Sequence, residues 1–225
     1  MSDAEQGQPL TVICVLRSGG GTYDQTWVAK LGRGVARNLT IPHRFVCLSD
    51  VPVDCERIPL AHAWPGWWSK IELFRPGVIN GPTLYFDLDT VIVGNFDYMA
   101  NNRSRFAMLK NFSATAQPGM VGSGVMWFRD AASVPHKVYE KFAKMPECYM
   151  DHHLRNADAA SSYIGDQAFV WDCLGGKIDT LEYPGILSYK RHCRKLLPED
   201  TSIVCFHGLP RPGDVSDSWV KEHWN

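Results

Sequence analysis

Residues 83–93 read TLYFDLDTVIV, and this stretch decides how the rest of the chain is interpreted. The run is apolar and β-rich, with Gly81-Pro82 before it and Gly94-Asn95 after it, which predicts a central strand. Side chains alternate along a strand, so Asp87 and Asp89 are expected on one face. Two such carboxylates repel each other unless a cation lies between them, and Mg²⁺ or Mn²⁺ suits their oxygens. The alternative is that one aspartate caps the next element and the other is solvated.

Length and composition narrow the class of protein. A chain of 225 residues that is 45% hydrophobic and 21% charged has room for one large α/β domain or two small ones. The net charge of −1 argues against a dedicated nucleic-acid binder. Seven cysteines without a CxxC pair predict reduced, buried thiols. Because residues 1–9 are polar and no stretch of about 20 apolar residues occurs, we expect a cytoplasmic protein without a transmembrane segment.

Apolar runs and amphipathic segments alternate along the chain. Strands are expected at residues 11–17, 43–50, 83–93, 105–110, 125–128 and 202–206. Helices are expected from the N-cap Asp24 to Leu39, after Pro65-Gly66, over 135–145 and from 165 to Gly175-Gly176. Such alternation predicts an α/β fold with a mostly parallel central sheet flanked by helices on both faces. We expect a single domain over residues 11–225 after a disordered tail of residues 1–10.

Polar side chains gather where the predicted strands end. In open α/β sheets, ligands bind beyond the carboxyl ends of the strands. Four titratable residues are expected there: Asp50, Asp87, Asp89 and His207. Carboxylates and an imidazole around one divalent ion, with Lys70 and Arg211 nearby, form a site suited to a diphosphate. The sequence therefore predicts metal-assisted departure of a nucleoside-diphosphate leaving group.

Four motifs in a fixed order carry a family resemblance. The DxD at residues 87–89 is followed by Gly-Ser-Gly-Val at 122–125, Gly-Asp-Gln at 165–167, and His207-Gly208 with Arg211-Pro212. From about residue 12 to residue 212 the chain resembles the GT-A glycosyltransferases. It is most similar to glycosyltransferase family 8, the relatives of glycogenin and lipopolysaccharide galactosyltransferase. The resemblance implies a Rossmann-like GT-A fold and sugar transfer from a UDP-sugar donor with Mn²⁺ or Mg²⁺, with retention of configuration.

The resemblance also implies roles for single residues. The metal ligands would be Asp87, Asp89 and His207, and the residues at the reaction centre would be Asp166 and Gln167. The residues around the donor would be Leu16 and Tyr23 at the uracil ring, Asp50 near the base, Lys70 and Arg211 at the diphosphate, Ser123 near the sugar, and Gly208. The chain departs from the family pattern in two motifs. Gly208 directly follows His207 and Arg211 replaces a lysine, although arginine also clamps a diphosphate; the usual asparagine before Ser123 is Gly122.

Several alternatives stay open on the sequence. Retaining transfer proceeds through a nucleophile such as Asp166 or by front-side attack; we interpret Asp166 and Gln167 as stabilising an oxocarbenium-like centre without a covalent bond. Residues 86–91 also match the first motif of haloacid-dehalogenase-like phosphatases, and a third reading is a non-catalytic sugar-nucleotide binding module. The expected acceptor is a saccharide or glycoconjugate, with a modified nucleobase still open. Five tryptophans either stack on a ligand or pack: Trp64, Trp67, Trp68, Trp219 and Trp224.

Overall fold

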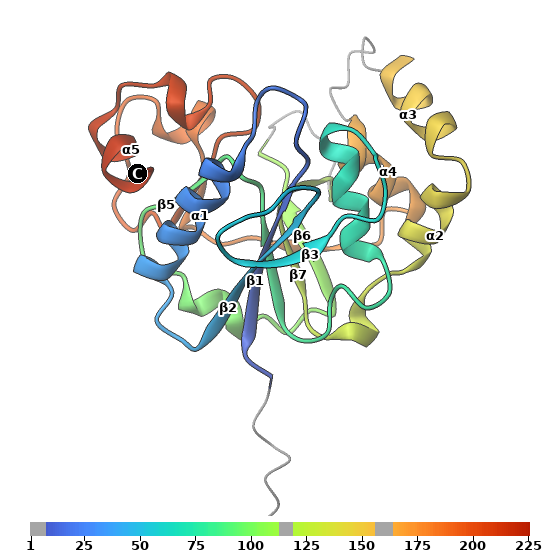
Figure 1. Ribbon diagram of the computed structural model, residues 1–225. Helices are drawn as coiled ribbons and strands as arrows, with labels where there is room; N and C mark the ends of the chain where they lie inside the picture. The colour runs from blue at the N-terminus through green and yellow to red at the C-terminus, as the bar shows by residue number, and fades with distance from the viewer. Residues whose placement is uncertain (1–7, 113–118, 156–163) are drawn as a thin grey trace, which may run out of the picture.

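The computed structural model describes residues 8–112, 119–155 and 164–225, and its centre is a twisted sheet with helices on both sides (Figure 1). Within these residues the sheet has seven strands in the order β3-β2-β1-β4-β7-β6-β8. β7 runs antiparallel to β4 and β6, and the other neighbouring pairs are parallel. The strands are β1 (Leu10–Leu16), β2 (His43–Ser49), β3 (Glu56–Pro59), β4 (Thr83–Phe86), β6 (Phe106–Lys110), β7 (Val121–Phe128) and β8 (Asp179–Leu181). The predicted mostly parallel α/β architecture is confirmed.

A second sheet corrects the interpretation of residues 83–93. The described part of the chain forms a three-stranded sheet in the order β5-β10-β9. Its strands are β5 (Thr90–Ile92), β9 (Ile186–Ser188) and β10 (Ile203–Cys205). The predicted single strand is therefore two strands in different sheets, joined by a turn in which the amide of Thr90 donates to the carbonyl of Asp87 at 3.1 Å. Asp87 and Asp89 lie in this turn, so strand alternation does not place them on one face.

One face of the large sheet is covered by α1 (Gln25–Asn38), near which the C-terminal helix α5 (Ser218–His223) also lies (Figure 1). The Asp24 carboxylate accepts a hydrogen bond from the Thr26 amide at 2.9 Å, which confirms the predicted N-cap. The Arg37 guanidinium donates to the carbonyl of His223 at 2.6 Å. The rings of Trp27 and Trp224 meet edge to face. The chain end is thus fixed against α1.

The opposite face is covered by helices that lie on the other side of the sheet in Figure 1. They are the 3₁₀ helix η2 (Gly66–Phe74), α2 (Lys137–Lys144), α3 (Pro146–Arg155) and α4 (Gly165–Cys173). Val138 and Phe142 of α2 are fully buried against η2 and α4. Short helical turns complete the fold: η3 (Asp97–Asn101), η4 (Ala131–Ser133), the π-helical turn η5 (Tyr189–Cys193) and η6 (Pro212–Asp214). The core forms two apolar clusters, and the second of them contains side chains of both η2 and α4, which it packs together at the large sheet.

The chain ends and cysteines bear on the remaining sequence predictions. The predicted tail of residues 1–10 falls mostly on residues 1–7, which lie outside the described residues, whereas Leu10 is buried and begins β1. All seven cysteines lie in the described ranges, and none of them forms a disulfide. Among the helices that the structure describes, none has the length and apolar character needed to cross a bilayer.

Candidate active site

A cavity of about 920 Å³ lies at the carboxyl ends of β1 and β4, bounded by η2, β7, α4 and the segment after β10. Ten of the twelve predicted site residues line it: Tyr23, Lys70, Asp87, Asp89, Ser123, Asp166, Gln167, His207, Gly208 and Arg211. Leu16 and Asp50 do not line it. The fold therefore brings together motifs that are up to about 190 residues apart in the sequence, at the sheet edge where open α/β proteins bind ligands.

Lys70 connects three of these motifs. Its ammonium Nζ lies 2.8 Å from Ser123 Oγ, 3.1 Å from Asp166 Oδ2 and 3.2 Å from Asp87 Oδ1. Lys70 is only 8% exposed. Burial alone would lower the pKa of Lys70, but the carboxylates of Asp166 and Asp87 outweigh it and raise the pKa above its usual value. Lys70 is therefore a fixed cation on the wall of the cavity, and both carboxylates beside it are held in place.

The two aspartates of the DxD motif face different partners. Asp87 accepts hydrogen bonds from Lys70 and from the Tyr85 hydroxyl, the latter at 2.5 Å. Asp89 is 6% exposed and accepts a hydrogen bond from the Tyr23 hydroxyl at 3.2 Å. Burial first, and then the charge of Asp87, raise the pKa of Asp89 to about 7. Asp89 is thus a buried carboxylate whose negative charge has no basic ion-pair partner within 4 Å among the described residues.

Tyr23 and Arg211 form one side of the cavity next to Asp89. The Arg211 guanidinium carbon lies 5.3 Å from the centre of the Tyr23 ring, a cation–π contact. The Arg211 amide donates to the Asp214 carboxylate at 2.8 Å, which fixes the segment after β10. Within the described residues, the buried Nε–H of Arg211 has no hydrogen-bond acceptor. An unpaired buried donor costs about 1–3 kcal/mol. The Arg211 side chain lines the cavity, where its positive charge is suited to an anionic ligand.

His207 enters the site from β10. The amide of Phe206 donates to the carbonyl of Asp89 at 3.2 Å, so the end of β10 runs beside the DxD turn. Nε2 of His207 lies 2.6 Å from Ser188 Oγ. Burial, followed by the charges of Lys190 and Arg191, lowers the pKa of His207 to about 4. The imidazole is therefore neutral near pH 7, and the neutral ring is the form that binds metal ions.

The predicted metal ligands are of types that bind Mn²⁺, but the described residues do not form a preassembled metal site. Carboxylate oxygens from Asp87 and Asp89 with a neutral imidazole from His207 suit Mn²⁺, which accepts both oxygen and nitrogen ligands. In the ranges that the structure describes, no three histidine, cysteine, aspartate or glutamate side chains are grouped as a metal site. The buried, uncompensated charge of Asp89 is the feature that fits a cation, and the three ligands stay a prediction.

Leu16 and Asp50 have other places in the fold. Leu16 is fully buried in the apolar core, and it is its neighbours Val15 and Arg17 that line the cavity. Asp50 accepts hydrogen bonds from Arg17 Nη1 at 2.9 Å, from the Ser18 amide at 2.9 Å and from the Ser18 hydroxyl at 2.7 Å. Burial would raise the pKa of Asp50, but these hydrogen bonds and the charge of Arg17 hold it below its usual value. Asp50 therefore positions the loop after β1, which carries Arg17 into the cavity.

Replacing Asp50 by alanine is expected to lower the free energy of unfolding by about 1–2 kcal/mol, because three hydrogen bonds to the β1 loop are lost together. Arg17 would also lose its fixed orientation toward the cavity. Urea unfolding of the variant checks the stability. Asp54→Ala, at the next exposed aspartate along the chain, is the matched control and should unfold like the wild type. Equal stability of the two variants would contradict the role given to Asp50.

Sequence reasoning missed several residues of the cavity wall, which include Arg17, Lys110, Phe112 and Arg191. Arg191 belongs to the basic run KRHCRK at residues 190–195, a charge pattern that the sequence analysis passed over. Lys110 is paired with Glu182 at the end of β6. Phe112 lies face to face with the imidazole of His207 at 5.8 Å between ring centres. The strand-end rule that selected His207 applies equally to the residues that follow β6.

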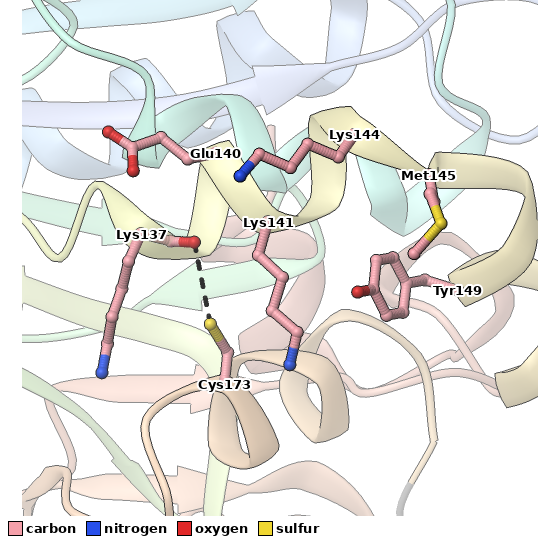
Figure 2. A pocket seen from close by; sticks show the side chains of 7 residues that line it. All are labelled: Lys137, Glu140, Lys141, Lys144, Met145, Tyr149 and Cys173. Carbon is pink, nitrogen blue, oxygen red and sulfur yellow. Dashed lines mark hydrogen bonds between the residues drawn. The ribbon is translucent and has the colours of Figure 1, made fainter.

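A second and smaller cavity, of about 280 Å³, lies between α2, α3 and α4 (Figure 2). It is lined by Lys137, Glu140, Lys141, Lys144, Met145, Tyr149 and Cys173. The Cys173 thiol donates to the carbonyl of Lys137 at 3.8 Å, and Lys141 Nζ lies 5.8 Å from the centre of the Tyr149 ring. None of the predicted site residues lies here, and its lysines are on the solvent face of α2. The large cavity is the better candidate because it holds the buried charged groups.

Solved structures share the fold of this chain, whereas no family model and no curated protein match it. The glycosyltransferase GlyE of Streptococcus pneumoniae TIGR4 superposes with a TM-score of 0.64 and 11% sequence identity, over 97% of this chain and 60% of GlyE. The galactosyltransferase LgtC, in complex with donor and acceptor sugar analogues, gives a TM-score of 0.55 and 10% identity, over 90% of this chain and 88% of LgtC. This chain thus spans about three-fifths of the length of GlyE. The chain has the mixed α/β fold of these glycosyltransferases, as the sequence resemblance implied.

Proposed function

We propose that this chain is a metal-dependent glycosyltransferase that transfers a sugar from a UDP-sugar to a saccharide acceptor with retention of configuration. The observation that carries the proposal is the charge arrangement of the large cavity. At one side Lys70 joins Asp87 to Asp166, and at the other Tyr23 contacts both the Asp89 carboxylate and the Arg211 guanidinium. The fold shared with GlyE and LgtC supports the same class of reaction.

The diphosphate of the donor would lie between these two sides. Asp87, Asp89 and His207 would hold Mn²⁺, which when bound supplies Lewis-acid neutralisation of the departing diphosphate. The guanidinium of Arg211, which lines the cavity, gives the phosphate oxygens a charged hydrogen-bond donor. Lys70 offsets the charge that accumulates on the leaving group. Together these residues make departure of the nucleoside diphosphate easier.

The sugar would lie toward α4. Asp166 Oδ2 is held by Lys70 at 3.1 Å, and Gln167 lines the same wall. A carboxylate restrained by an ammonium stabilises positive charge at the anomeric carbon by electrostatics and is a weaker nucleophile, which favours front-side attack. LgtC has been solved as an active-site glutamine-to-glutamate variant, and Gln167 is the glutamine of this cavity. A glycosyl adduct on Asp166, seen by intact-protein mass spectrometry, would contradict the non-covalent route.

A thermal-shift panel of nucleotide sugars with and without Mn²⁺ tests the donor. Binding to the native state alone stabilises by RT ln(1 + [L]/Kd), or about 2.7 kcal/mol at a ligand concentration of 100 Kd. We expect UDP-sugars to raise the melting temperature with Mn²⁺ and to have a much smaller effect in EDTA. The control is the same panel on Arg211→Ala, which removes the guanidinium from the cavity wall and should reduce the shift. A shift that is equal with and without Mn²⁺ would contradict the metal-assisted site.

The two other readings of the sequence have distinct outcomes. A haloacid-dehalogenase-like phosphatase would release phosphate from p-nitrophenyl phosphate with Mg²⁺, whereas the proposed enzyme would not. A non-catalytic module would bind the sugar nucleotide and leave it intact. Slow, metal-dependent hydrolysis of a UDP-sugar in the absence of acceptor therefore separates the proposed enzyme from both.

A further inference from the structure

The three tryptophans within residues 64–68 have different surroundings. Trp64 is 7% exposed and stacks on the His62 ring with 4.0 Å between ring centres. Trp68 is 4% exposed and stacks on Phe142. Trp67 is 47% exposed, lines the large cavity and stacks on no other ring among the described residues. Two of the three are therefore packing residues, and the third presents an aromatic face to the cavity.

Local geometry explains why Trp67 is held at the cavity. It belongs to the 3₁₀ helix η2, in which side chains three positions apart lie on the same side. Trp67 therefore lies on the same side of η2 as Lys70, whose ammonium binds Asp166. Gly165 at the start of α4 has φ +76°, and a Cβ there would lie 2.9 Å from Trp67 Nε1. Glycine at this position lets the indole edge contact α4, so the ring is supported at its edge beside Asp166.

A half-exposed indole beside carboxylates is suited to a pyranose ring. The C–H groups on one face of a pyranose pack on an aromatic ring, while its hydroxyls bond to neighbouring polar groups. Polar side chains that line the same cavity as Trp67 include Ser69, Asp166 and Gln167. The residues suited to the nucleotide are Tyr23, which donates to Asp89, and Arg211, which contacts the Tyr23 ring. The apolar surface at Trp67 is therefore available to a second ligand.

We infer that Trp67 forms the acceptor subsite and stacks on a terminal pyranose of a saccharide acceptor. This inference rests on the proposed function, because a saccharide bound at Trp67 is an acceptor only if the neighbouring site binds a sugar donor. The net charge of −1 and the carboxylates beside Trp67 favour an uncharged sugar over a nucleic acid. A nucleobase would also stack on the indole and is included as a separate arm of the test.

Saturation-transfer NMR with methyl β-D-galactopyranoside and methyl β-D-glucopyranoside tests this subsite in the presence of UDP and Mg²⁺. Irradiation of the aromatic protons should transfer saturation to the ring protons of at least one pyranoside. Trp67→Ala is expected to weaken pyranoside binding about tenfold, and Trp67→Phe should restore part of it. Leu196→Ala is the matched control, because Leu196 is an exposed apolar side chain that does not line the cavity.

The outcomes separate the subsite from the proposed function. The subsite is overturned if wild type and Trp67→Ala bind both pyranosides equally, if wild type binds neither, or if adenosine and not a pyranoside depends on Trp67. If pyranoside binding depends on Trp67 but wild-type protein neither binds nor hydrolyses UDP-glucose or UDP-galactose, the saccharide subsite is upheld and the proposed transferase activity fails.

Discussion

Replacing Lys70 by methionine is expected to lower the free energy of unfolding by about 3–5 kcal/mol, the usual cost of removing one partner of a buried ion pair. Methionine fills nearly the same volume but carries no charge. The buried Asp166 and the partly exposed Asp87, both within 3.2 Å of the ammonium, would lose the cation that they share. The loss in stability would come chiefly from these two uncompensated carboxylates. Urea unfolding at pH 7.5, followed by circular dichroism, measures it.

The double variant Lys70→Met/Asp166→Asn is the control for this interpretation. Removing the Asp166 charge should recover part of the stability that the single variant loses, because one of the two unpaired carboxylates is gone. It should not recover sugar-nucleotide hydrolysis, since both changed residues line the donor cavity. A Lys70→Met protein within about 1 kcal/mol of the wild type would show that Lys70 is not the electrostatic centre of the site.

Replacing Asp89 by asparagine is expected to lower metal-dependent cleavage of a UDP-sugar by about 10²–10³-fold, the usual effect of removing one charged group from a preorganised site. Asparagine keeps the size and the acceptor for the Tyr23 hydroxyl but removes the charge that the cation requires. The measurement is release of UDP from the donor with Mn²⁺. A variant that cleaves the donor as fast as the wild type would remove Asp89 from the metal site.

The same substitution should stabilise the metal-free protein, which excludes unfolding as the cause of lost activity. The pKa of Asp89 is raised from about 3.8 to about 7 in the folded state. Because the folded protein binds this proton more tightly, ionisation carries no stability penalty below about pH 4 and the full penalty above about pH 7. Asp89→Asn removes the penalty. Its melting temperature should therefore exceed that of the wild type by more at pH 8 than at pH 5, with EDTA present.

Much of the fold could be predicted from hydrophobic periodicity and from residues that mark the ends of helices and strands. The helix after Asp24 and the strand predicted over residues 43–50 have long, regular patterns, and both are confirmed, the strand as His43–Ser49. The prediction of a single strand over residues 83–93 was wrong because apolar residues continue on both sides of the DxD turn. A run of that kind gives no local sign that β4 and β5 belong to different sheets. Only the long-range partners Val125 and Cys205, which pair with Phe86 and Thr90, separate the two strands.

The location of the site at the ends of the strands could be predicted from the sequence. The roles of single residues were harder to predict. Leu16 was assigned from the family resemblance, whereas its side chain is buried in the core and its neighbours Val15 and Arg17 line the cavity. Asp50 was placed near a ligand, whereas its carboxylate is fully used by Arg17 and Ser18. Trp67 was grouped with two packing tryptophans. The side of the 3₁₀ helix on which each ring lies depends on contacts with α2 and α4, which no local pattern contains.

Anomalous diffraction at the manganese edge, from crystals soaked with UDP and Mn²⁺, shows whether the DxD aspartates and His207 hold the metal beside the diphosphate. We predict one anomalous peak, from a manganese ion bound by Asp87, Asp89 and His207. The diphosphate of UDP should lie between this ion and the Arg211 guanidinium. Two results would contradict the metal-assisted donor site. One is UDP bound in another orientation, and the other is UDP bound with its phosphates on Lys70 and Arg211 but without a manganese peak.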